Sequence, residues 1–128
     1  MKKLVITVFA IAIAASFLYG CKKSAEDRLM AHMDQAISIL EANKDNPDKA
    51  AEELDKYTAG NKDDLAAIKK ELEEMEKTLS EDDKKKKGEE MMKKMGPLME
   101  RAMKLMAGDS KLAGNEKVQK AMTEFFPR

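Results

Sequence analysis

The chain has 128 residues, a length that suits one domain and leaves no room for a second catalytic one. It carries 24 Lys and Arg against 24 Asp and Glu, so the formal net charge is zero although 38% of the residues are charged. Nucleic-acid-binding proteins normally show a one-sided basic excess, and we therefore expect no nucleic-acid partner. Aromatic residues make up only 5% whereas Met occurs 11 times, a composition that favours helix over sheet.

The first 21 residues have the organisation of an export signal. Met1-Lys2-Lys3 is a positive start, and residues 4–18 carry no charge. This apolar run is shorter than the membrane span of about 20 residues but fits the apolar region of a secretory signal. The sequence Leu18-Tyr19-Gly20-Cys21 then resembles the lipobox of bacterial lipoproteins, which has Leu three positions before an invariant Cys and a small residue directly before it. Tyr19 departs from the small residue usual at its position.

The resemblance implies how residues 1–24 are processed. Residues 1–20 would be a signal peptide removed by cleavage between Gly20 and Cys21, and Cys21 would receive a diacylglyceryl thioether and an acylated amino terminus. This covalent lipid is the only attached group we expect, and residues 21–24 would be a short tether. Lys22 stands where Asp typically retains lipoproteins at the inner membrane, which favours the periplasmic face of the outer membrane. The alternative is an uncleaved amphiphilic anchor with a chance Cys.

Apolar spacing and capping residues predict helices over the rest of the chain. Leu, Ile, Met and Ala recur at three- to four-residue steps, and capping residues such as Ser24, Asn46 and Ser80 precede these runs. Pro47 suits a first helical position, and Asn115 can cap a last short helix. The predicted helices are residues 25–44, 47–79, 81–107 and 115–125.

Two positions within these predicted helices are open to interpretation. The apolar residues of 47–79 keep the same helical spacing before and after Gly60, which favours one continuous helix, weak or kinked near residues 58–61. The alternative ends a helix at Gly60 and starts another with Asn61 as its cap. In the third helix, Gly96-Pro97 predicts a bend near Met95.

Short connections between these helices predict the architecture. Links of two or three residues near Asn46 and Ser80 favour antiparallel neighbours. The sequence therefore predicts an all-α fold for residues 25–128, an antiparallel up-down bundle of three long helices on which a short C-terminal helix folds back. No cysteine follows Cys21, so packing without disulfides must hold this domain together.

Methionine is concentrated in the third predicted helix. Six methionines fall between residues 91 and 106, and such a stripe in a chain short of aromatics is typical of core packing. The alternative is a soft-metal site, because thioethers suit Cu(I) and Met95, Met99 and Met103 are one helical turn apart, with His32 as a further ligand from the first helix. A third interpretation is an adaptable surface for a partner helix or a small apolar ligand.

The sequence carries no motif for catalysis. It has no Gly-rich phosphate loop, no Ser nucleophile elbow and no His-Glu-x-x-His pair, and its one histidine excludes sites built from several. Its Asp and Glu alternate with Lys at spacings typical of surface ion pairs. We therefore expect a binding or scaffolding module rather than an enzyme, held at the cell envelope by lipid and docking an envelope protein. A Met-rich carrier of Cu(I) or of a small apolar ligand is the alternative.

Overall fold

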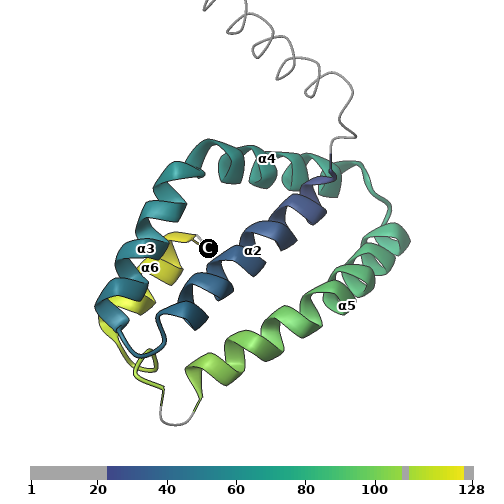
Figure 1. The fold of residues 1–128 in the computed structure, drawn as a ribbon. Helices are drawn as coiled ribbons and strands as arrows, with labels where there is room; N and C mark the ends of the chain where they lie inside the picture. The colour runs from purple at the N-terminus through teal and green to yellow at the C-terminus, as the bar shows by residue number, and fades with distance from the viewer. Residues whose placement is uncertain (1–22, 108–109, 126–128) are drawn as a thin grey trace, which may run out of the picture.

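The computed structural model describes residues 23–107 and 110–125, and over these ranges all regular structure is helical (Figure 1). The predicted all-α class is confirmed. The helices are α2 (Ala25–Ala42), α3 (Pro47–Gly60), α4 (Lys62–Thr78), α5 (Glu81–Met106) and α6 (Glu116–Phe125).

Four of the five described helices begin at predicted capping residues, whereas the Asn61 side chain makes no capping hydrogen bond at the start of α4. At the other four starts a side-chain oxygen accepts a hydrogen bond from a backbone N–H of the first turn, which satisfies one of the donors that a helix end leaves unpaired. The caps are Ser24, Asn46, Ser80 and Asn115, which accept from the N–H groups of Asp27, Lys49, Asp83 and Val118 at 3.1–3.2 Å.

The prediction of one continuous helix over residues 47–79 is wrong, because α3 ends at Gly60 and α4 begins at Lys62. Asn61 has φ −115° and ψ 13°, and its side-chain Nδ2 donates to the backbone oxygen of Tyr57 at 2.8 Å. Asparagine side chains compete in this way for backbone groups, and glycine next to it lowers helix propensity further. A break of one residue leaves the apolar spacing nearly in phase, so periodicity alone could not detect it.

The α3–α4 arm runs antiparallel to α2. Arg28 near the start of α2 contacts Glu71 late in α4, whereas His32 further along α2 contacts Tyr57 in α3. Because of the break, the arm bends around α2 (Figure 1). One helix thereby packs against both α3 and α4.

Helix α5 packs along α2 and not along α4, its neighbour in sequence. The two-residue connection was expected to make α4 and α5 antiparallel neighbours, but the helices diverge from it in Figure 1. Contacts of Glu26 with Lys87 and of Glu41 with Arg101 show that α2 and α5 run parallel. The predicted bundle of three long helices is therefore corrected to a central helix flanked by a broken arm and by α5.

The core lies where α2, α3 and α6 meet. Helices α3 and α6 are the most closely associated pair, and side chains from both are fully enclosed. The largest fully buried side chains are Leu54, Ile68, Leu112 and Val118. Phe125 is buried as expected of a plug at the end of α6, whereas Phe126 lies outside the described residues.

Helix α5 contributes little to this core. Leu105 is its only buried residue, and Met92, Met99 and Met103 are 74%, 51% and 63% exposed. The prediction that the methionine stripe is core packing is thus wrong for these three side chains. The helix continues through Pro97 to Met106, so the bend expected near Met95 does not interrupt it.

Candidate functional site

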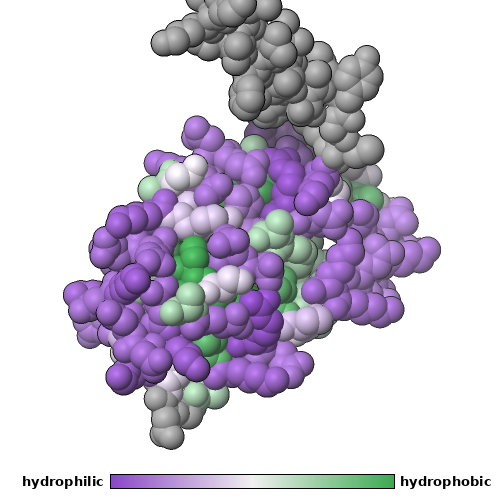
Figure 2. All heavy atoms as spheres, viewed as in Figure 1, coloured by the Kyte–Doolittle hydropathy of each residue, from purple (hydrophilic) through white to green (hydrophobic). Residues whose placement is uncertain are grey.

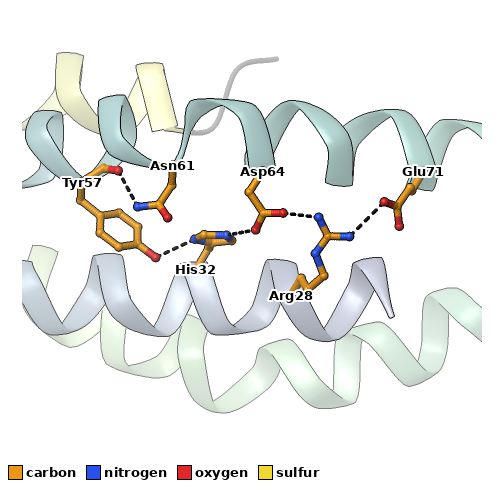
Figure 3. A network of polar contacts seen from close by, with 6 residues as sticks. All are labelled: Arg28, His32, Tyr57, Asn61, Asp64 and Glu71. Atoms are coloured by element: carbon orange, nitrogen blue, oxygen red, sulfur yellow. Dashed lines mark hydrogen bonds and ion pairs between the residues drawn. The ribbon is translucent and has the colours of Figure 1, made fainter. Parts of the chain in front are cut away.

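A polar network joins α2 to the α3–α4 arm (Figure 3). His32 is only 8% exposed, and both of its ring nitrogens have partners. Its Nδ1 lies 2.6 Å from the Tyr57 hydroxyl and its Nε2 lies 2.7 Å from Oδ2 of Asp64. Arg28 continues the network by donating to Asp64 and, at 2.9 Å, to Glu71. Tyr57 and Asp64 lie on either side of the break at Asn61, and both face α2 in Figure 3.

The charge of Asp64 strengthens the bonds that hold α2 against the α3–α4 arm. Hydrogen bonds from His32 and Arg28 hold the pKa of the Asp64 carboxyl below its usual value, so this group is an ionised acceptor. His32 therefore donates from Nε2 to this carboxylate. Burial, with the nearby charge of Asp64, raises the pKa of Tyr57 and keeps that hydroxyl protonated.

An apolar groove of about 550 Å³ lies along α4. Its floor is formed by aliphatic side chains and by one aromatic ring at the end of α6, and charged side chains of both signs stand at its rim. The apolar lining residues are Leu29, Leu65, Ala66, Ile68, Leu72 and Phe125, and the polar ones are Thr58, Lys62, Lys69, Glu73, Glu76 and Glu124. Volumes of this size are typical of ligand sites.

The polar network holds the walls of this groove in place. Arg28 and Asp64 directly precede Leu29 and Leu65, which line the groove from α2 and α4. At one end, the Tyr57 ring lies with its centroid 6.3 Å from that of Phe125. The bonds between α2 and α4 therefore fix the separation of the two helices that border the apolar floor.

Ion pairs fasten α5 to the other side of α2. Lys94 lies 3.0 Å from Asp27, and Arg101 binds Asp34 and, at 2.8 Å, Glu41. These contacts lower the pKa values of Asp27 and Glu41 and raise that of Arg101. All of these side chains are partly solvated, which limits what each pair contributes to stability. Figure 2 shows hydrophilic residues over most of one face, with a few apolar residues among them.

A second, smaller cavity of about 160 Å³ lies between α2, α3, α5 and α6. Its lining is wholly apolar, and four thioether side chains from three helices take part in it. They are Met33, Met99, Met106 and Met122.

The structure does not bring the predicted metal ligands together as a set. His32 uses both ring nitrogens in bonds to the α3–α4 arm, so metal binding there would require breaking one of them. Met95 packs against the core, whereas Met99 and Met103 are exposed on α5. Gly20 and Cys21, and the whole signal segment 1–20, lie outside the described residues.

The sequence analysis missed the polar network and gave His32 a role only in the alternative Cu(I) site. A usable signal was present, because Arg28 and His32 lie one turn apart and Tyr57, Asn61 and Asp64 follow at steps of four and three. Such spacing places polar groups on one helical face. The spacing does not show that these two faces meet, whereas the structure places them opposite each other (Figure 3).

No protein-family model, curated protein or solved structure matches this chain. Within the described ranges, no helix is both long enough and apolar enough to cross a membrane. The same residues contain no group of three or more His, Cys, Asp or Glu side chains placed to hold a metal ion.

Proposed function

We propose that this protein is a lipid-anchored bacterial envelope protein that binds an amphipathic helix of an envelope partner in the groove along α4. The groove is the observation that carries the binding role. Its floor is apolar over a stretch of α4 from Leu65 to Leu72, and ionised side chains border it. A surface with an apolar centre and a charged rim is typical of protein interfaces.

The shape of the groove favours a helix as the occupant. Lining residues extend from Lys62 to Glu76, a length of about 21 Å at 1.5 Å per residue. An amphipathic helix of about four turns matches that length and can place its apolar face on the floor. Lys62 and Lys69 at the rim can pair with acidic side chains of such a helix, and Glu73 and Glu76 with basic ones.

Site-specific photocrosslinking in cells tests this proposal. A benzophenone amino acid at Lys69 lies at the groove, and the same probe at Glu74 of α4 lies outside it. We expect one protein adduct from position 69, absent from position 74 and reduced by Leu72→Glu. Equal adducts from both positions, or an adduct insensitive to Leu72→Glu, would contradict groove binding. A small apolar molecule retained by the purified full-length protein, with no adduct at position 69, would replace the helix as occupant.

Lipid attachment at Cys21 is the second part of the proposal and has its own test. The lipobox resemblance of residues 18–21 supports it, and three acyl chains would anchor a protein firmly because each buried methylene contributes about 0.8 kcal/mol. Labelled palmitate should be incorporated into the parent chain and not into Cys21→Ala, which should leave the membrane fraction. An unchanged membrane fraction and no loss of lipid mass would overturn the anchor.

A second candidate function is carriage of Cu(I), and the methionine-lined cavity favours it. Met33, Met99, Met106 and Met122 surround one apolar space, and thioethers are soft neutral ligands that suit this ion. This set shares only Met99 with the ligands predicted from sequence, which were Met95, Met99, Met103 and His32.

Anaerobic competition with a coloured Cu(I) chelator tests this candidate. If the cavity holds the ion, Met33→Leu with Met122→Leu should abolish binding. The matched control, Met92→Leu with Met103→Leu, changes two exposed methionines that do not line the cavity and should retain binding. Equal affinity in the parent and both variants would exclude the cavity as the site.

A further inference from the structure

Helix α5 presents an exposed stripe of methionine and glycine beside the face that packs on α2, and one of its members, Met99, also lines the small apolar cavity. At 3.6 residues per turn, positions 88, 92, 96, 99 and 103 fall within an arc of about 80°. All five residues are exposed: Gly88, Met92, Gly96, Met99 and Met103. The side chains that bind α2, Lys87, Lys94 and Arg101, project from a different side of the helix.

The two glycines leave this face open to close approach. A Cβ added at Gly88 or Gly96 would meet no other atom within 4 Å, so their helical surface is unobstructed. A second helix can approach the backbone closely at such positions. Unbranched methionine side chains adapt to an irregular partner surface, and Met92 and Met99 flank Gly96 along the stripe.

Charged residues along one flank of the stripe indicate which second helix can pack against it. Glu89, Lys93, Glu100 and Lys104 are all exposed and lie on the same side of it. The point halfway between Glu89 and Lys104 coincides with the point halfway between Lys93 and Glu100. Both points fall between residues 96 and 97. An identical helix laid antiparallel across this point would place Glu89 opposite Lys104, and Lys93 opposite Glu100. In a parallel twofold pair these flanks would lie on opposite sides of the interface, so the four charges would not meet.

We propose that α5 pairs with α5 of a second copy of this chain, antiparallel, about a twofold axis that passes between Gly96 and Pro97. Such an isologous contact uses one surface twice. Within one chain Glu100 and Lys104 already pair at 2.8 Å, but both are solvated, so sharing them with the second copy costs little. The surface is separate from the groove along α4, so either proposal can fail without the other.

Cysteine crosslinking of the full-length chain tests the axis. Residue 96 would lie next to its own copy, within the Cα separation of about 4.4–6.8 Å that a disulfide needs. The matched control is residue 89, which would be displaced from its copy by about 22 Å along the helix. Under mild oxidation we expect Gly96→Cys to form a covalent dimer in membranes and in detergent. Glu89→Cys should remain at the level of the parent, which reports any crosslink through Cys21.

Charge reversal in the Gly96→Cys chain tests the orientation. Glu89→Lys with Glu100→Lys makes all four flank positions basic and should reduce the covalent dimer. Adding Lys93→Glu and Lys104→Glu restores complementary pairs and should restore the dimer. The proposal is overturned by a Gly96→Cys chain that stays monomeric, by equal crosslinking at residue 89, or by a dimer that all-basic flanks do not weaken.

Discussion

Helices α6 and α5 both join the fold through one principal neighbour, and different side chains make the two contacts. α6 packs on α3 with Val118 and Ala121 fully enclosed, and Leu112 just before it is equally buried. α5 lies on α2 through Lys87, Lys94 and Arg101, and it buries only Leu105.

The difference teaches that neighbouring helices of one small protein can have unequal stability. Burial of apolar area contributes about 25 cal/mol per Å² and is not screened as charges are, whereas solvated ion pairs contribute little and are screened by salt. We therefore expect the α3–α6 end to be the last part to unfold and α5 to open first. Such a helix is free to exchange its weak internal contacts for those of a second copy.

Truncation of the core should have the largest effect. Leu54→Ala removes a fully buried side chain of α3 and should lower the free energy of unfolding by about 3 kcal/mol, because the cavity remains. Urea unfolding followed by circular dichroism measures it. The control is Met92→Ala on exposed α5, and a comparable loss there would contradict the comparison between the two regions.

Loss of the Asp64 carboxylate, the central acceptor in the polar network, should lower the free energy of unfolding by an intermediate amount. Asp64→Ala leaves Nε2 of buried His32 without its partner and should cost about 1–2 kcal/mol. Asp63→Ala removes the neighbouring exposed carboxylate and should change the urea midpoint far less. If the two variants have the same urea midpoint, the network does not brace α2 against α4.

Lowering the pH should weaken the contact between Asp64 and His32 and so lower the stability of the fold. The pKa of Asp64 is below its ordinary value of 3.8 in the folded protein. The contribution of Asp64 to stability is therefore complete above the ordinary pKa of 3.8, and it is lost as the pH falls through the lower pKa of the folded protein. The stability difference between the parent and Asp64→Asn should shrink over this acidic range and stay constant above it. A difference that persists in acid would show that the bond does not depend on the carboxylate.

Loosening of α5 should be the smallest effect and the most local. Added salt, or Arg101→Met, should speed amide hydrogen exchange in α5 while α6 stays protected. Lys84→Met, which removes a pair with Glu81 internal to α5, is the control. Faster exchange in α6 than in α5 would reverse the proposed order of stability.

The sequence predicted the fold class and helix starts because their causes are local. Ser24 and Asn46 cap the turns that follow them, and apolar spacing marks each helix. The direction of packing could not be predicted, because local spacing does not show which helical faces meet. Asp64 contacts His32 between two helices that border the groove, and nothing in the spacing identified that contact. The exposure of Met99 was missed for a related reason, since spacing identifies a helical face without identifying what covers it.

Tyr57 also gives the protein a built-in optical reporter. The chain has no Trp and two Tyr, and the other, Tyr19, belongs to the predicted signal peptide. The Tyr57 hydroxyl lies 2.6 Å from an imidazole nitrogen of α2, and its ring lies beside Phe125 of α6. An excited phenol readily passes its proton to such a base, so we expect its emission to be dim in the folded protein. An increase in emission on partner binding or heating would then report separation of α2 from α3 without any label.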